Sequence, residues 1–392
     1  MKGLFVVAAL LGTAAGIGAD LSGEVALEAR LFARDGAPGQ HGNNLSISIE
    51  PEYYRDWADG DRRLAVTPFL RWDQGDGRRS HVDLREFYWR QSFGAADLYI
   101  GVRKVFWGVT ESLHLVDVVN QTDLVENLDA EDKLGQPMLQ LSLLRDWGDV
   151  DLLVMPYFRR RTFAGADGRL RPPLPVADRA VYEADLEEYN PDLAARWSHV
   201  LGDFDLALSH FYGTDREPRL VPGLSGAGAP RLLPHYDLVH RSGLEVQYVR
   251  GDWLWKLEAL LRDGVDGRSA AAVGGFEYTL YGLFGSALDL GVVAEYQYDD
   301  RGAPFAPVGD NDAVLGGRLI FNDVQDTQVL ALAAVDTDKG SRFASVEGSR
   351  RLGANGLLRL EGRFFANVDR GDAVFFALRR DDYVQVEYVR YF

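Results

Sequence analysis

The stretch LLRLEGRFF, residues 357–365, alternates apolar and charged side chains in a way that decides the class of fold. Successive side chains of a β-strand point to opposite faces, so Leu358, Leu360 and Phe364 share one face while Arg359 and Arg363 share the other. Runs of about 10 residues with this alternation are typical of strands in a transmembrane β-barrel, whose apolar face meets lipid and whose polar face meets the lumen. We therefore interpret residues 357–365 as a membrane-spanning strand.

The same alternation recurs along almost the whole chain, from Leu21 to Phe392. The predicted strands lie near residues 21–33, 44–57, 61–74, 80–93, 96–108, 136–147, 149–162, 191–201, 203–213, 236–250, 252–264, 270–283, 286–299, 311–322, 326–338, 341–352, 355–368 and 380–392. Single-chain bacterial barrels have an even number of antiparallel strands. The sequence therefore predicts an all-β protein, an antiparallel transmembrane barrel of about eighteen strands, with sixteen as the alternative count.

The connections between these runs are of two kinds. Tight turns such as Asp59-Gly60 and Gly251 follow the even-numbered strands, as turn residues of hairpins do. The long connections all follow odd-numbered strands, at residues 34–43, 109–135, 163–190, 214–235, 300–310 and 369–379. Outer-membrane barrels pair short periplasmic turns with long extracellular loops in this way, whereas a periplasmic β-sandwich, the alternative, has no need of such asymmetry.

The N-terminus resembles an export signal. Lys2 precedes an apolar run and the small residues Gly16, Gly18 and Ala19, so we expect residues 1–19 to be a signal peptide and residues 20–392 the barrel. The chain has no cysteine, which excludes disulfides and thiolate metal sites. A formal net charge of -17 argues against nucleic acid as a partner, because phosphate binding needs clustered cations. The location that these features favour is the bacterial outer membrane.

Strand alternation directs charges of both signs into the lumen. The candidate pore-lining residues are Arg71, Arg103, Arg196, Arg241, Arg318, Arg359, Arg363, Glu245 and Glu361. Eighteen strands enclose more space than side chains fill, so we expect a wet, polar lumen. The alternative for any single residue is a cross-strand pair that stiffens the wall.

The connection at residues 109–135 combines acids with a hydrophobic stripe that includes Leu113, Val116 and Val118. Its candidate constriction residues are Asp117, Asp123, Glu126 and Asp129. A purely exposed loop has no need of that stripe, so we predict that this loop folds into the barrel, with an external lid as the alternative. We expect Asp117, Asp123 and Glu126 to face Arg103, Arg196, Arg241, Arg318 and Arg363 across a narrow zone, where lining charge and radius set selectivity.

Aromatic residues near the predicted strand ends are expected to form girdles at the membrane interfaces. They include Tyr53, Trp72, Trp107, Trp253, Trp255, Tyr296 and Tyr298. The chain closes on Phe392, which resembles the C-terminal aromatic signature that the barrel-assembly machinery recognises.

Two segments resemble porin-like barrels related to the alginate-export family. They are GVRKVFWG at residues 101–108, leading into DVVNQTD at residues 117–123, and the closing segment of residues 379–392. The resemblance implies an eighteen-stranded passive channel in which Trp107-Gly108 turns the chain inward and arginines on the wall form the selectivity zone. The inward charges of this chain are balanced and not strongly cationic, which departs from alginate exporters.

The function that we predict is passive diffusion of small or linear polar solutes. The alternatives are an exopolysaccharide export channel of the alginate-export type and a non-conducting adhesive or structural barrel. Catalysis is not expected, since strand alternation places the pair His240 and Ser242 on the lipid side. The acids around residues 310–312 and 336–338 lack the spacing of a calcium loop, so no metal or cofactor is predicted.

Partners are expected among lipids and solutes. The charged loops at residues 163–190 and 214–235, with Arg159, Arg160, Arg161, Arg169 and Arg171, are predicted to face lipopolysaccharide. The sequence leaves open the solute, the direction of transport, the oligomeric state and whether the pore is open at rest.

Overall fold

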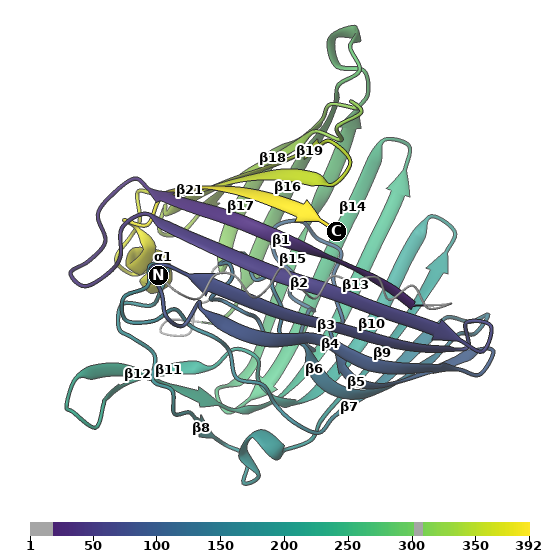
Figure 1. Cartoon of the computed structure of the whole chain (residues 1–392), viewed down its shortest axis with the longest axis horizontal. Helices are drawn as coiled ribbons and strands as arrows, with labels where there is room; N and C mark the ends of the chain where they lie inside the picture. The colour runs from purple at the N-terminus through teal and green to yellow at the C-terminus, as the bar shows by residue number, and fades with distance from the viewer. Residues whose placement is uncertain (1–18, 302–308) are drawn as a thin grey trace.

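The computed structural model describes residues 19–301 and 309–392, so the predicted signal peptide lies almost entirely outside the described residues. Eighteen strands form one antiparallel barrel (Figure 1). They are β1 (Ala19–Phe32), β2 (Asn44–Trp57), β3 (Arg62–Asp73), β4 (His81–Ser92), β5 (Ala96–Arg103), β6 (Gln136–Leu143), β7 (Asp149–Met155), β9 (Asp192–Leu201), β10 (Phe204–Thr214), β13 (Leu238–Arg250), β14 (Trp253–Gly264), β15 (Gly267–Leu280), β16 (Asp289–Asp299), β17 (Asn311–Ile320), β18 (Gln328–Asp336), β19 (Arg342–Leu352), β20 (Gly356–Ala366) and β21 (Tyr383–Tyr391). This confirms the predicted architecture of eighteen strands.

Each barrel strand pairs with the next along the chain, and the first pairs with the last. In the closing pair, Leu27 lies opposite Tyr388 and Glu28 lies opposite Glu387. The barrel therefore has no open edge, which removes the unpaired backbone groups that a sheet would expose to lipid. Among the described residues, no helix is long and apolar enough to cross a membrane.

The two faces of the wall are sorted as the alternation predicts. Leu70, Ile100, Leu261 and Leu315 are between 47% and 64% exposed on the outside, while charged residues such as Arg71 are buried inside. This distribution is the reverse of a soluble protein and is that of a barrel embedded in lipid.

Two predicted strands are shorter by five residues or more in the structure. The strand predicted at 149–162 ends at Met155, because Pro156 has no N–H group to continue the ladder. The strand predicted at 96–108 ends at Arg103, where the chain turns into the barrel. The pairing of β3 with β4 shifts register between Thr67 and Pro68. The cause is again a proline, because Pro68 has no N–H group to donate to the neighbouring strand.

The extracellular loops contain structure that the sequence analysis did not predict. β8 (Val181–Tyr182), β11 (Arg219–Leu224) and β12 (Pro230–Tyr236) form a small separate sheet that joins the loop after β7 to the loop after β10. These strands lie together at one end of the barrel (Figure 1). A short helix, α1 (Ala373–Leu378), packs Phe375 against Phe365 of β20.

Candidate functional site: the lumen and its inner loop

The connection between β5 and β6, residues 104–135, folds into the barrel as predicted, and we call it the inner loop. Its apolar stripe explains why: Val116, Val118 and Val119 are buried against the inner surfaces of five strands. The wall residues of this cluster are Met138, Leu153, Met155, Ala194, Phe211 and Val239. Burying these side chains stabilises the inward position, at about 1.5–3 kcal/mol for each fully buried large side chain. One side of the lumen is thus filled by a hydrophobic core.

Trp107 belongs to this core, so the prediction that it lies in a membrane girdle is wrong. Its side chain is only 2% exposed and packs with the stripe of the inner loop. By contrast Trp72, Trp255 and Tyr296 are 46–55% exposed on the outer face. The physical reason is that β5 ends at Arg103, so Trp107 follows the chain into the lumen.

Two wall carboxylates hold the N-terminal half of the inner loop by its backbone. Glu258 of β14 accepts hydrogen bonds from the N–H groups of Val109 (2.7 Å) and Thr110 (3.0 Å). Glu295 of β16 accepts from the N–H groups of Glu111 and Ser112, both at 2.8 Å. Strand alternation alone would direct both acids into the lumen as free charges. Their lone pairs are instead engaged by the loop, and no sequence signal distinguishes that role.

A buried cluster of arginines fastens the other half of the inner loop to β1–β4. Arg71 contacts Glu126 at 2.7 Å and Glu28 at 3.1 Å. Arg79 contacts Glu28 at 2.8 Å and donates to the Val125 carbonyl at 2.9 Å. All of these charged side chains are less than 10% exposed. The buried arginines therefore neutralise the buried glutamates. An unpaired charge would be costly here, because the surroundings have a low dielectric constant.

Asp123 is held in the same way, by Arg85 at 2.7 Å and by the Thr162 hydroxyl at 2.6 Å. The predicted acidic face of the loop does meet arginines: Glu126 meets Arg71 and Asp129 meets Arg363, both candidate pore-lining residues, whereas Asp123 meets Arg85, which was not a candidate. Of the predicted set, only Arg71 contacts Glu126. Asp117 pairs with Lys133 of the loop itself at 2.9 Å.

Arg103, Arg196 and Arg241 do not oppose the loop acids, which corrects the expectation for these three. The Arg103 side chain donates to Gln140 and lies 3.8 Å from the ring centre of Tyr99. Arg196 reaches over the small Ser209 of β10 to Glu245, with both contacts at 2.9 Å. Arg241 donates to Asp215 above the wall. Each of these cations finds a closer partner in the wall or in an extracellular loop.

The remaining predicted arginines lie on the β17–β21 side. Arg318 pairs with Glu111 of the inner loop at 2.5 Å, and Arg363 pairs with Asp129 at 3.1 Å. Glu361 accepts a hydrogen bond from Asn127 at 2.9 Å. Arg359 pairs with Glu387 at 3.1 Å. Arg318, Arg363 and Glu361 therefore hold the inner loop, and their role in selectivity stays a prediction.

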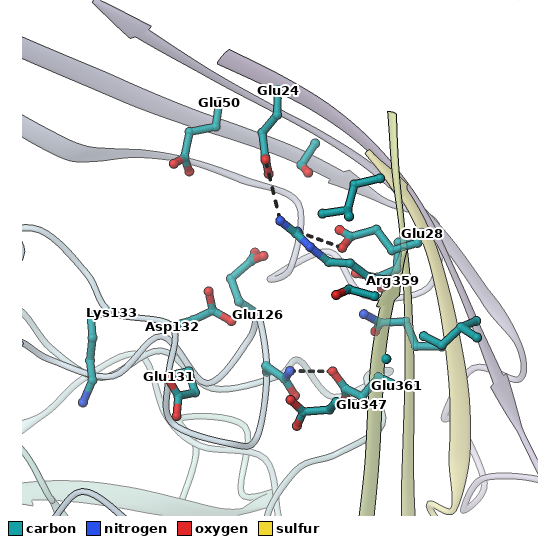
Figure 2. Close-up of a pocket in the computed structure, with 18 of the residues that line it drawn as sticks. Glu24, Glu28, Glu50, Glu126, Glu131, Asp132, Lys133, Glu347, Arg359 and Glu361 are labelled. Atoms are coloured by element: carbon teal, nitrogen blue, oxygen red, sulfur yellow. Dashed lines mark hydrogen bonds and ion pairs between the residues drawn. The ribbon is translucent and has the colours of Figure 1, made fainter. Parts of the chain in front are cut away.

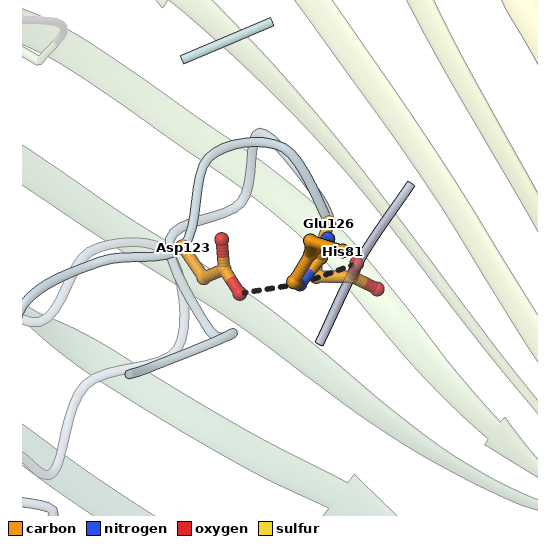
Figure 3. Close-up of side chains that lie close together, drawn as sticks. All are labelled: His81, Asp123 and Glu126. Carbon is orange, nitrogen blue, oxygen red and sulfur yellow. Dashed lines mark ion pairs between the residues drawn. The ribbon is translucent and has the colours of Figure 1, made fainter. Parts of the chain in front are cut away.

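His81, Asp123 and Glu126 form a compact group in the lumen (Figure 3). The His81 Nε2 atom lies 3.8 Å from Asp123 Oδ2 and 3.7 Å from Glu126 Oε1. These are the residue types that bind zinc, whose bonds to them are about 2.0–2.2 Å long. Both carboxylates are already engaged by Arg85 and Arg71, whose positive charges oppose a further dication.

The acids near residues 310 and 336 are also engaged by a cation. Lys339 Nζ lies 2.7 Å from Asp310 and 3.1 Å from Asp336, and Asn311 donates to Asp338 at 2.8 Å. An ammonium group thus occupies the position that a metal ion would need among these oxygens.

A chamber of about 730 Å³ opens inside the barrel beside the inner loop (Figure 2). Glu24 and Glu50 reach into it from β1 and β2, and Glu126, Glu131 and Asp132 reach into it from the inner loop. Burial in the barrel, together with the carboxylates of Glu126 and Asp129, raises the pKa of Asp132 to about 7. This wall of acids is the main polar surface that a solute would meet.

His114 carries a positive charge near the chamber. Burial alone would lower its pKa, but the hydrogen bond to Glu131 and the nearby carboxylate of Glu258 outweigh burial and raise the pKa to about 10. Its Nε2 atom lies 3.2 Å from Glu131, so the two residues form an ion pair on the inner loop at neutral pH.

A second cavity, of about 860 Å³, lies among the extracellular loops, and we call it the vestibule. Phe163, Pro172, Leu220 and Val265 line it, so it is far less polar than the chamber. Leu124 and Leu128 of the inner loop also line it, which makes the inner loop the partition between the vestibule and the chamber.

The extracellular arginines are less exposed than expected for a lipopolysaccharide surface. Arg159 pairs with Asp83 at 2.6 Å, and Arg169 pairs with Asp381 at 2.7 Å with 1% of its side chain exposed. Arg161 donates to Gln121 of the inner loop at 3.1 Å. These three residues brace the loops, and Arg160 is left with an exposed side chain.

The comparisons with known proteins support this architecture. No protein-family model matches the chain, and no curated protein matches it. Among solved structures it is similar to a BenF-like porin from Pseudomonas fluorescens Pf-5, with a TM-score of 0.54 and 7% identity over 96% of this chain and 97% of that one. It is also similar to OccK11 (OpdR) of Pseudomonas aeruginosa, with a TM-score of 0.52 and 10% identity over 95% of each chain. OpdQ of the same organism gives a TM-score of 0.51 and 10% identity over 96% of this chain and 98% of that one.

These likenesses show the fold of an outer-membrane porin. Together with the closed barrel and its apolar outer surface, they make this chain an integral β-barrel of the bacterial outer membrane. The three similar structures are porins, and they give no support to the resemblance to the alginate-export family.

Proposed function

We propose that the protein is a passive channel for small polar or charged solutes. The observation that carries this proposal is the chamber of about 730 Å³, which is lined by charged side chains inside a closed transmembrane wall. A wall built only for mechanical support has no need to keep a polar cavity open beside a firmly held loop. Passive channels select by radius and by lining charge, and the inner loop supplies both.

The inner loop is suited to a fixed constriction. It is attached to the wall by the hydrophobic core, by Glu258 and Glu295, and by the arginine cluster around Glu126. These attachments lie on different sides of the lumen, and the chamber lies beside the loop, where Gln328 of β18 and Glu347 of β19 line it. We infer that the loop narrows the pore on one side and leaves the solute path on the side of the chamber. The predicted arginines contribute mainly by holding this shape.

Catalysis is disfavoured by the position of the one His–Ser arrangement that the sequence offered. His240 and Ser242 are exposed on the outer face of β13, while Arg241 between them points inward. Ser242 is hydrogen-bonded to His210 at 2.9 Å, in a region that faces lipid. A hydrolase acting on a soluble substrate needs its nucleophile in a cleft that this face does not offer.

Polysaccharide export of the alginate type is less well supported. A linear polyanion needs a continuous cationic track, whereas Glu24, Glu50 and Asp132 present carboxylates to the chamber. An adhesive barrel without conductance is the other alternative, and the long extracellular loops with their separate sheet favour it.

Single-channel conductance in planar bilayers tests the proposal. The purified barrel, verified as folded by its heat-modifiable gel mobility, should give steady ohmic steps without an energy source. A folded barrel that stays silent would overturn the channel and favour the adhesive alternative.

A further inference from the structure

The lining of the chamber is unequal in charge. Ten carboxylates line it, against seven lysine and arginine side chains. Four cations behind the lining pair with four of these acids: Arg30 with Glu28, His114 with Glu131, Lys256 with Glu111 and Arg363 with Glu347. The vestibule differs, since its lining has five carboxylates and five arginines and is otherwise rich in apolar residues. A solute passing from the vestibule to the chamber would thus leave a largely apolar surface and meet one whose incompletely paired acids are Glu24, Glu50 and Asp132.

Two arginines, Arg359 in the lining of the chamber and Arg363 just outside it, are each shared between two or more acids. Arg359 contacts both Glu24, at 3.8 Å, and Glu387, at 3.1 Å (Figure 2 shows the arginine between its neighbours). Arg363 contacts Asp129 (3.1 Å) and Glu347 (2.7 Å). Each arginine carries one charge, so each of these groups keeps an excess negative charge.

Two further carboxylates have no cationic partner within 4.0 Å among residues 19–301 and 309–392: Glu50 and Asp132. Lys104 is a lining cation that likewise has no such acidic partner, and it offsets one of the two. Arg71, Arg79 and Arg85 on the β1–β4 side are paired with acids that are themselves buried, and of these three only Arg85 partly offsets Glu50 and Asp132.

The register of the wall places Glu24 directly opposite Glu50 on neighbouring strands. Like charges in that arrangement destabilise a sheet. In the same wall the opposite pair Glu28 and Glu387 is compensated by several arginines, whereas Glu24 has only the shared Arg359 at 3.8 Å and Glu50 has no cation within 4.0 Å among the described residues. The repulsion between Glu24 and Glu50 lowers the stability of the wall, but in a channel the uncompensated negative charge faces the lumen and can attract cations.

We infer that the pore prefers cations to anions, that Glu24, Glu50 and Asp132 set this preference, and that its favoured solutes are organic cations with an apolar body. This inference rests on the proposed channel function. The apolar vestibule accounts for the apolar body, and the chamber accounts for the positive charge.

The reversal potential across a potassium chloride gradient measures the preference directly. The wild-type channel should be more permeable to potassium than to chloride. In E24Q/E50Q the permeability ratio should fall about fourfold at low salt, about twofold for each charge removed, and the effect should shrink as salt rises. The control D185N/E187Q removes the same charge from the exposed loop after β7 and should leave the ratio unchanged.

E50Q alone guards against misfolding of the double variant, since Glu50 has no ion pair to lose among the described residues. It should fold as the wild type does and lower the ratio about twofold. An anion-preferring wild-type channel, or an unchanged ratio in folded E50Q and E24Q/E50Q, would overturn the inference while leaving the channel intact. Absence of conductance in a folded barrel would instead overturn the channel itself.

A panel of four blockers tests the solute class: benzylammonium, benzoate, benzyl alcohol and methylammonium. Benzylammonium should block at the lowest concentration, because it alone combines a positive charge with an aromatic ring. In E24Q/E50Q, benzylammonium and benzyl alcohol should block at similar concentrations. Equal or stronger block by benzoate would refute the predicted charge. Equal block by methylammonium would refute the need for an apolar body.

Discussion

Replacing Arg79 with methionine should both destabilise the barrel and loosen the inner loop. Arg79 is 4% exposed and contacts Glu28 and Asp73, each at 2.8 Å. It also donates to the carbonyl oxygen of Val125, which lies on the inner loop. Methionine fills much of the same volume without a charge, so the substitution chiefly removes the cation.

The loss of unfolding free energy in R79M depends on the partners that Glu28 and Asp73 keep. Removing one partner of a buried ion pair costs about 3–5 kcal/mol, because the other charge stays buried. Glu28 keeps Arg71 at 3.1 Å and Arg30 at 3.2 Å, and Asp73 keeps Asn44 at 2.8 Å. We therefore expect the lower end, about 3 kcal/mol, or roughly a hundredfold in the unfolding equilibrium.

Urea unfolding in lipid vesicles, extrapolated linearly, measures this free energy. The double variant R79M/D73N removes the carboxylate whose only ion pair among the described residues is with Arg79 and should recover about 1–2 kcal/mol of the loss. As a control, R350M removes the exposed partner of Asp323, a pair at 2.9 Å, and should cost less than about 1 kcal/mol. If R79M matches R350M in stability and also shows wild-type conductance noise, the arginine cluster does not hold the loop.

Three further predictions concern the inner loop and its chamber. Because the pKa of Asp132 is raised to about 7, this carboxylate loses its charge as pH falls through 7. The cation preference, measured as the reversal potential, should therefore decline between pH 8 and pH 6, and D132N should lack this decline. Trp107→Ala leaves a cavity in the lumen core and should lower the free energy of unfolding by about 3–5 kcal/mol, whereas Trp253→Ala on the outer face should cost much less in the same urea titration. A Cβ at Gly243 would lie 2.9 Å from a Val116 methyl group, so Gly243→Val should displace the inner loop and change the mean conductance, and an unaltered conductance would argue against the packing described.

The wall of this barrel was predictable because its determinants are local. The period of two fixes which residues of a strand face lipid, as Leu360 does, and which face the lumen, as Arg363 does. Glycine-containing turns mark where many of the strands end. Pro156 is an equally local signal, and it shows that β7 could have been ended correctly from sequence.

The contents of the lumen were predictable only in part. The hydrophobic stripe at Val116–Val119 correctly indicated that the loop folds inward, because apolar residues in a long loop need a surface to cover. The partners of each charge depend on the register between strands and on how far a side chain reaches. Arg196 meets Glu245 across a strand because Ser209 between them is small, and no local pattern contains that information.

Trp107 illustrates the same limit for an aromatic residue. Its sequence neighbourhood resembles a strand end at a membrane interface, and only the departure of the chain at Arg103 moves it into the core. Glu258 and Glu295 are similar, since an acid that accepts backbone N–H groups looks in sequence like any acid that faces water.

The pairing of β1 with β21 also constrains the order in which the strands of the barrel can pair during folding. The first strand to be synthesised must wait for the last, so every partly made chain carries a strand edge with unpaired N–H and C=O groups. When the two strands meet, Glu28 arrives opposite Glu387, and the repulsion between these carboxylates is relieved only where Arg30, Arg79 and Arg359 have already reached their positions. Closure of the ring is thus coupled to the prior arrangement of its interior.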